Sequence, residues 1–306
     1  MPDTQIDPKL EQVARKVDAQ SRLVRSWALT GGISAQVTAL EIERLGGAIE
    51  KWVVRQHGAA DRASNPNIAA DEFKLLTILQ ANGIRAPKPY AFDASGEIFA
   101  TPYIVLEYVE GEPEFAPPDL DDFLHQAATA LAEIHRIDGA ELAFLPEQQA
   151  RQTEKLRQRP AQLDDSLDEG RIRAALEAVW PVKQVNPTAL LHGDFWPGNL
   201  LWREGKLAAV IDWENAVLGD PLADLGNTRL EMLWAFGSEA MERFTANYLA
   251  LRTGLNTINL PYWDLCAALR PASKIGDWAG DPIIERKMRD GHKWFVMQAF
   301  EKLASR

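Results

Sequence analysis

The sequence has a single cysteine, Cys266, among 306 residues. One cysteine excludes a disulfide within the chain and favours a reducing compartment such as the cytoplasm. No stretch approaches the roughly 18 consecutive apolar residues that a membrane-spanning helix needs. The first residues are polar and carry charges of both signs, so we expect no signal peptide. The chain also lacks internal repeats and low-complexity tracts.

Basic residues are in the minority, with 33 lysines and arginines against 44 aspartates and glutamates and a formal net charge of −11. A nucleic-acid backbone is bound by clustered basic side chains, so we expect no nucleic-acid partner. An acidic surface favours solubility and would also favour a cationic ligand. The apolar fraction of 46% and the charged fraction of 25% are typical of a globular protein, and the length suffices for two lobes.

The first third of the sequence alternates between strand and helix patterns. β-Branched residues and turn glycines predict five strands, at residues 23–29, 36–42, 51–56, 90–92 and 103–109. Apolar residues at helical spacing predict a first helix over residues 7–19 and a second over residues 67–80. We therefore predict a small, mostly antiparallel sheet with one helix inserted between its strands.

The rest of the sequence is mainly helical. A long helix is predicted over residues 120–137, and two more over residues 260–278 and 281–303. This change of pattern predicts an α+β fold of two lobes. The N-lobe, residues 1–110, would hold the small sheet, and the larger C-lobe, residues 111–306, would be mainly helical.

The most informative stretch, residues 190–202, reads LLHGDFWPGNLLW. Two apolar strand ends flank a loop that presents Asp194 and Asn199, and a third predicted strand, residues 207–211, is followed by Asp212. Such oxygen-bearing side chains suit Mg²⁺, which takes one or two protein carboxylates and completes its shell with phosphates. Phosphoryl transfer needs this positioning and charge neutralisation. We therefore expect Asp194 to orient an acceptor hydroxyl, and Asn199 and Asp212 to hold the metal.

This pattern resembles the catalytic loop and metal motif of the aminoglycoside phosphotransferase and choline kinase superfamily, which shares the protein-kinase-like fold. The matching residues are His192, Asp194, Asn199 and the Ile-Asp-Trp of residues 211–213. A plainer alternative is a tight turn in which Asp194 and Asn199 are turn residues only. The resemblance implies a small-molecule kinase that uses Mg²⁺ with ATP or GTP. It also implies that His192 and Asp224 support the loop and do not react.

The same resemblance implies a nucleotide site in the N-lobe, made of Gly32, Ser34, Arg55, Glu72, Glu107 and Val109. The glycine-rich loop would cover the phosphates. The arginine would contact the α- and β-phosphates, with the glutamate of the following helix as its acidic partner. The last two residues belong to a hinge that would meet the base through backbone groups, so ATP and GTP both remain open.

The acceptor is not specified by these residues. Only seven residues separate Asp212 from Asp220, which leaves no room for an activation loop that docks a peptide. Aminoglycosides, macrolides, choline-like amines, amino alcohols and sugars are all candidates. Acidic and aromatic side chains could line a pocket for a cation, although exposed helix faces and core tryptophans explain them more simply. These side chains are Glu214, Trp263, Asp264, Asp277, Trp278 and Asp281.

Two other functions are compatible with the same fold. A catalytically silent nucleotide-binding or regulatory module would bind Mg²⁺-nucleotide without transferring a group. A nucleotidyltransferase would release pyrophosphate in place of ADP. The sequence leaves the oligomeric state open.

Overall fold

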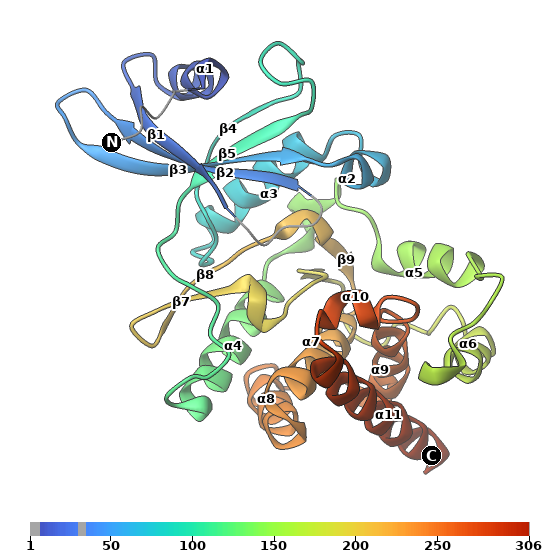
Figure 1. Cartoon of the computed structure of the whole chain (residues 1–306). Helices are drawn as coiled ribbons and strands as arrows, with labels where there is room; N and C mark the ends of the chain where they lie inside the picture. The colour runs from blue at the N-terminus through green and yellow to red at the C-terminus, as the bar shows by residue number, and fades with distance from the viewer. Residues whose placement is uncertain (1–6, 30–34, 306) are drawn as a thin grey trace. The chain divides into compact units, whose positions relative to one another are not determined.

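The computed structural model describes residues 7–29 and 35–305 of the chain (Figure 1). The chain divides into two compact units, Met1–Glu110 and Gly111–Arg306. The first is built on an antiparallel sheet and the second is mainly helical, so the α+β class expected from the sequence is confirmed. Within the described ranges, no helix combines the length and the apolar composition needed to cross a membrane.

The first unit contains a five-stranded antiparallel sheet in the order β1-β2-β3-β5-β4. Its strands are β1 (Arg22–Ala28), β2 (Ala35–Glu43), β3 (Ile49–His57), β4 (Pro89–Asp93) and β5 (Tyr103–Glu107). These are the five strands predicted from the sequence, with ends displaced by one or two residues. The helices of this unit are α1 (Pro8–Val17), α2 (Ala59–Ser64) and α3 (Ile68–Ala81). Sequence reasoning missed α2, because six residues are too few to show a helical period.

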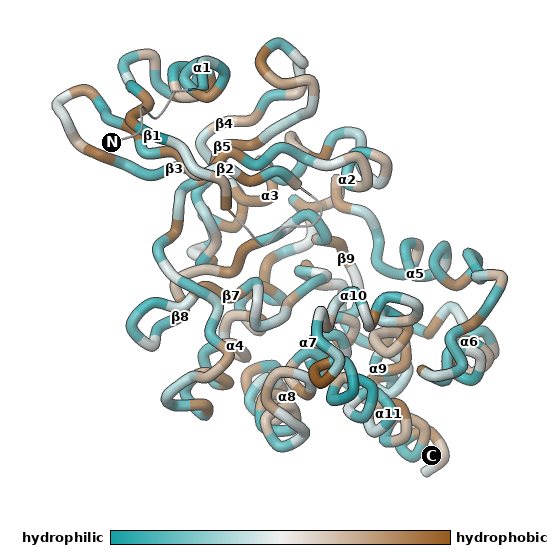
Figure 2. The backbone as a smooth tube through the Cα atoms, viewed as in Figure 1, coloured by the Kyte–Doolittle hydropathy of each residue, from teal (hydrophilic) through white to brown (hydrophobic). Residues whose placement is uncertain are grey.

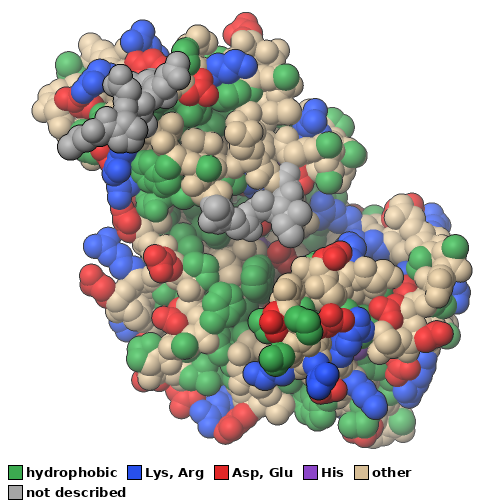
Figure 3. All heavy atoms as spheres, viewed as in Figure 1, with side chains coloured by type: hydrophobic (Ala, Val, Ile, Leu, Met, Phe, Trp, Pro, Cys, Tyr) green, Lys and Arg blue, Asp and Glu red, His purple; other side chains and the backbone are tan. Residues whose placement is uncertain are grey.

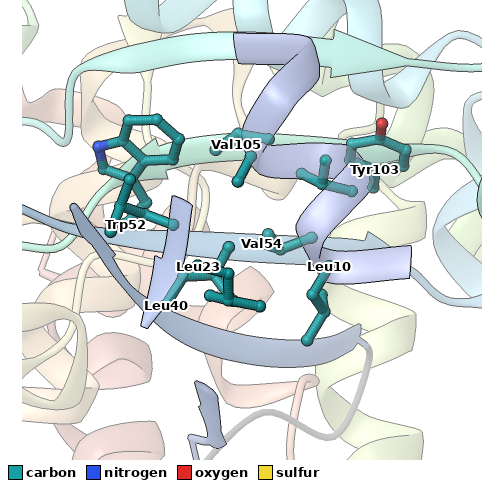
Figure 4. Packing of buried hydrophobic residues seen from close by; sticks show 10 residues of the cluster. Leu10, Leu23, Leu40, Trp52, Val54, Tyr103 and Val105 are labelled. Carbon is teal, nitrogen blue, oxygen red and sulfur yellow. The ribbon is translucent and has the colours of Figure 1, made fainter. Parts of the chain in front are cut away.

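Helix α1 packs its apolar stripe against one face of the sheet (Figure 4). Leu10 of α1 joins a buried cluster with Leu40 of β2 and with Trp52 and Val54 of β3. Full burial of one such aliphatic side chain contributes roughly 1.5–3 kcal/mol. Successive side chains of a strand point to opposite faces. Arg55 is therefore directed to the face opposite α1.

The second unit combines helices with two small β-ribbons. Its helices are α4 (Leu120–Ile134), α5 (Gln148–Arg157), α6 (Glu169–Glu177), α7 (Pro221–Phe236), α8 (Ser238–Leu251), α9 (Leu260–Ala268), α10 (Ile275–Ala279) and α11 (Pro282–Ala304). The ribbons pair β6 (Ala189–Leu191) with β9 (Val217–Gly219), and β7 (Leu200–Arg203) with β8 (Lys206–Val210). Helix α7 packs against both α8 and α9, and 11 of its 16 residues are buried.

The outer helices of this unit have one buried and one exposed face. Hydrophilic and hydrophobic residues alternate along α4 and α11 in Figure 2, as expected for helices that cover a core. On the face drawn in Figure 3, acidic and basic side chains are interspersed over the helical unit. Such mixing is usual for a surface exposed to water.

One predicted helix is wrong in its extent. The sequence pattern predicted a continuous helix over residues 260–278, whereas α9 ends at Ala268 and α10 begins at Ile275. Pro271 has no amide hydrogen and disfavours a helical conformation in the residue before it, so the helix cannot continue through this point. Arg270 consequently lies in the connection between the two helices.

Candidate active site

Residues 192–194, His-Gly-Asp, lie in a sharp turn that follows β6. Gly193 has φ of +80°, and a Cβ atom added to it would lie 2.2 Å from the backbone oxygen of Asn215. Only glycine avoids both the strained conformation and the clash. The position of Asp194 after β6 therefore depends on glycine at residue 193.

The turn is anchored by a carboxylate of α7. Asp224 accepts hydrogen bonds from the backbone nitrogens of His192, at 2.6 Å, and Gly193, at 2.9 Å. Its Oδ2 also lies 3.2 Å from Nε2 of His135. Burial opposes ionisation of Asp224, but the interaction with His135 and the backbone donors outweigh it, so its pKa lies below the usual value. The anchor is thus a buried, ionised carboxylate.

Backbone and amide hydrogen bonds gather the three oxygen-bearing side chains predicted from the sequence. Asn199 donates from Nδ2 to the backbone oxygen of Asp194 at 2.9 Å. The backbone nitrogen of Ile211 donates to the backbone oxygen of Asn199 at 2.9 Å, which brings Asp212 beside the loop. His192 lies with Nε2 3.0 Å from the backbone oxygen of Ile211. Asp212 has φ of +69°, a strained backbone that is common at functional sites.

The donor chemistry at this loop fits Mg²⁺. Across residues 7–29 and 35–305, no group of three or more His, Cys, Asp or Glu side chains is arranged to hold a metal ion. Asn199 and Asp212 offer one amide oxygen and one carboxylate, because the amide nitrogen of Asn199 is turned towards Asp194. A small protein ligand set of this kind suits Mg²⁺, which keeps waters and takes phosphate oxygens as further ligands.

Sequence reasoning missed a cation at the centre of this site. Arg270, in the connection between α9 and α10, donates from Nη2 to Oδ1 of Asp194 at 2.5 Å. Its Nη1 lies 3.8 Å from Oε1 of Glu231, on α7. Burial raises the pKa of Glu231 to about 7; the charge of Arg270 lowers it and that of Asp194 raises it. The proline at 271 was the available signal, since it marks the end of the helix that delivers Arg270.

In the first unit, two predicted site residues form a buried ion pair. Nη1 of Arg55, on β3, lies 2.9 and 3.2 Å from the carboxylate oxygens of Glu72, on α3. The side chains are 8% and 3% exposed, so the pair is largely removed from water. Nε2 of His57 lies 3.4 Å from the same glutamate. Burial, followed by the charge of Arg55, lowers the pKa of His57 to about 3, which leaves its imidazole neutral at physiological pH.

The other nucleotide-site residues expected from the sequence are placed as follows. Glu107 is the exposed last residue of β5, and its backbone nitrogen donates to the backbone oxygen of Lys88 at 2.8 Å. Val109 makes no hydrogen bond to any described residue, so its backbone groups are available. Gly32 and Ser34 lie outside the described residues.

Three of the six side chains suggested for a cation pocket have structural roles. Asp264 is fully buried and lies 3.0 Å from Nε of Arg229, and Trp263 is 3% exposed. Asp281 accepts hydrogen bonds from the backbone nitrogens of Ile283 and Ile284 as the N-cap of α11. Two of the suggested residues are therefore core groups and a third is a helix cap, as the plainer interpretation of the sequence expected.

Similarity to curated proteins extends over about two thirds of the chain. Acyl-CoA dehydrogenase family member 11 of Rattus norvegicus is 25% identical over 235 residues, which are 65% of this chain and 29% of that protein. The chain thus spans less than a third of the length of this relative. Viomycin phosphotransferase of Streptomyces vinaceus is 28% identical over 211 residues, 64% of this chain and 69% of that protein.

Solved structures confirm the predicted protein-kinase-like fold. The GDP complex of wild-type aminoglycoside 2'-phosphotransferase-IIIa superposes with a TM-score of 0.66, covering 95% of this chain and 99% of that one at 17% identity. The model of the phosphotransferase enzyme family matches residues 28–273, which include the loop and both predicted metal ligands. This match covers most of the chain, and the chain therefore belongs to the phosphotransferase enzyme family.

Proposed function

We propose that this protein is a small-molecule kinase that transfers the γ-phosphoryl group of ATP or GTP to an acceptor hydroxyl. The observation that carries the proposal is the anchored loop, in which Asp224 fixes the turn and Asp194, Asn199 and Asp212 are held beside one another. An aminoglycoside-, choline- or sugar-like acceptor is compatible with the family.

Asp194 is the proposed group that orients the acceptor. Its side chain is 22% exposed, so a ligand can reach it. It would accept a hydrogen bond from the acceptor hydroxyl and take its proton as the oxygen attacks the γ-phosphorus. The new oxygen–phosphorus bond forms as the bond from the γ-phosphorus to the β,γ-bridging oxygen breaks, and the nucleoside diphosphate leaves.

Asn199 and Asp212 are the proposed ligands of Mg²⁺. The bound ion would neutralise the negative charge of the nucleotide phosphates and help to hold them in line with the acceptor. The hydrogen bond from Asn199 to the backbone oxygen of Asp194 supports this division of roles. It couples the position of a metal ligand to that of the acceptor-orienting residue, while Asp194 itself stays out of the ligand set.

The unit of residues 1–110 is the proposed nucleotide-binding lobe, and the unit of residues 111–306 would carry catalysis and the acceptor site. In the first unit Arg55 would contact the α- and β-phosphates, and its ion pair with Glu72 supports this role because it fixes the guanidinium. The available backbone groups of Val109 support a hinge that binds the purine base. We also propose phosphate contacts from Gly32 and Ser34.

Product analysis with a panel of acceptors tests the proposal. The protein would be incubated with Mg²⁺ and ATP or GTP, with aminoglycosides, macrolides, choline, amino alcohols, hydroxy acids and sugars supplied separately. We expect at least one acceptor to stimulate release of ADP or GDP and to gain one phosphoryl group in its mass. Release of pyrophosphate would indicate nucleotidyl transfer. Nucleotide binding without any product would indicate a silent module, and either result would contradict the proposal.

A further inference from the structure

Arg270 makes incomplete use of its hydrogen-bonding capacity. A guanidinium has five N–H donors and binds planar oxyanions through two parallel hydrogen bonds. Within the described part of the chain, Arg270 makes a single side-chain hydrogen bond, to Asp194, and its Nη1 is buried without a hydrogen-bond partner. Glu231 lies 3.8 Å away, beyond hydrogen-bond distance. The side chain as a whole is 29% exposed, so a ligand can approach the guanidinium although its Nη1 is buried.

Three further basic residues come from α5 and from the connection that holds Arg270. Arg151 and Lys155 lie on α5, and Lys274 lies in the same connection as Arg270. Partial burial lowers the pKa of Lys155, and the positive charges of Arg270, Arg151 and Lys274 lower it further. These three positive charges therefore act on Lys155. The cluster so defined consists of Arg151, Lys155, Arg270 and Lys274.

Protein carboxylates pair with this cluster only at Arg270, which contacts Asp194 and Glu231. Among the described residues neither Lys155 nor Lys274 forms an ion pair. Arg151 donates instead to the backbone oxygen of Asn215 at 3.0 Å, in the segment that follows Asp212. The three members of the cluster other than Arg270 therefore lack a carboxylate partner among the described residues, and such cations favour an anionic ligand.

We propose that the acceptor carries a carboxylate or a phosphate ester besides its hydroxyl, and that Arg270 and Lys155 bind this anionic group beside Asp194. The inference rests on the proposed function. The anionic group supplies oxygens for the unpartnered Nη1 of Arg270 and for the ammonium of Lys155. It competes with Asp194 for the guanidinium, and the released carboxylate then accepts the hydrogen bond from the acceptor hydroxyl.

Matched acceptors test the charge requirement. Short hydroxycarboxylates, the corresponding hydroxyamides and hydroxyalkyl phosphates would be compared by nucleoside diphosphate release. We expect turnover with at least one anionic series and loss of turnover when the carboxylate becomes an amide. Turnover of the hydroxycarboxylates would identify a carboxylate as the recognised group, and turnover of the hydroxyalkyl phosphates would identify a phosphate ester. Equal turnover of acid and amide would overturn the proposal while leaving the kinase function intact.

The variant Lys155→Met tests the site itself, with Lys287→Met, on the exposed face of α11, as its matched control. Loss of a charge-assisted contact should raise KM for the anionic acceptor roughly 10- to 100-fold, with KM for the nucleotide unchanged. Lys287→Met should behave as the unmodified protein. A rise in KM for the nucleotide instead would assign the cluster to the donor and overturn the proposal.

A binding measurement separates failure of this inference from failure of the proposed function. Thermal unfolding would be followed with each hydroxycarboxylate or hydroxyalkyl phosphate in the absence of nucleotide. Stabilisation that is lost in Lys155→Met would support the anion site even if no transfer were found. Absence of stabilisation by either anionic series, in a protein that phosphorylates neutral or cationic acceptors, would contradict it.

Discussion

The carboxylate of Asp224 accepts a hydrogen bond from the backbone nitrogen of His192 at 2.6 Å, although 32 positions separate the two residues in the sequence. This bond ties the first turn of α7 to the loop after β6. It fixes the loop through its backbone, so the side chain of Asp194 takes no part in the anchor.

Replacing Asp224 with asparagine tests this anchor. An amide offers one acceptor oxygen where the carboxylate offers two, so one buried backbone N–H loses its partner at a cost of about 1–3 kcal/mol. We expect a corresponding loss in the free energy of unfolding and a lower kcat, both measured on the same preparation. Asp290→Asn, at an exposed position of α11, is the control and should change neither. Unchanged turnover in Asp224→Asn would contradict the anchoring role.

Replacing Gly193 with alanine tests the turn. The added Cβ would lie 2.2 Å from the backbone oxygen of Asn215, and relieving this overlap should cost roughly 1–3 kcal/mol beyond the conformational strain. Gly205→Ala is the matched control, because Gly205 has a similar φ of +72° but nothing within 4 Å of the added atom. Denaturant unfolding and kcat should both be affected more at position 193. Equal effects at the two glycines would show that the clash is relieved without consequence.

The ion pair between Arg55 and Glu72 predicts strongly non-additive mutations. Arg55→Met leaves a buried carboxylate without its cation and should lower the free energy of unfolding by about 3–5 kcal/mol. The double variant Arg55→Met/Glu72→Leu removes both charges and should be less destabilised than the single variant. Arg22→Met breaks an exposed pair with Glu43 on the same sheet and should cost at most about 1 kcal/mol. Additive effects at 55 and 72 would contradict the coupling.

The raised pKa of Glu231 predicts a pH dependence of stability. Folded Glu231 titrates at about 7 and its ordinary value is 4.5, so between these values the folded state holds a proton that the unfolded chain has released. Stability therefore falls as the pH rises through this window. The shift corresponds to at most about 3 kcal/mol. Glu231→Gln should consequently be more stable than the unmodified protein at about pH 8, with a smaller difference at about pH 5.

Chemical denaturation at the two pH values measures this difference. Glu242→Gln, at an exposed position of α8, is the control for the loss of a carboxylate. The same change in unfolding free energy for Glu231→Gln at both pH values would show that the carboxyl titrates normally in the folded state.

Local sequence patterns predicted most helices and strands well, because apolar residues recur with a different spacing in strands and in helices. All five strands of the first unit and helices α1, α3 and α4 were expected near their observed positions. The extent of α9 was mispredicted, because the apolar helical pattern continues past Pro271, which a helix does not. Helix α2 was missed because it is too short for a periodic signal.

The candidate site also contains residues that could be predicted from the sequence and residues that could not. Asp194, Asn199 and Asp212 lie within a short stretch, so their convergence could be predicted from spacing alone. Arg270 lies 76 positions from Asp194, and Glu231 joins it from another helix. Contacts between residues so far apart in the sequence depend on how α7 and α9 pack. This packing cannot be predicted from local sequence patterns. The supposed cation pocket was overestimated because burial of Asp264 against an arginine cannot be seen in composition.

The most direct test of the account compares the unmodified protein with Asp194→Asn. Nucleoside diphosphate release would be measured in the presence of an active acceptor, and Mg²⁺-nucleotide affinity would be measured on both proteins. We expect acceptor-stimulated release to fall by about 10²–10⁴-fold, the usual contribution of a positioned acid or base, with the Kd for the nucleotide nearly unchanged. Retention of full turnover by Asp194→Asn would contradict the assignment of this residue and the mechanism built on it.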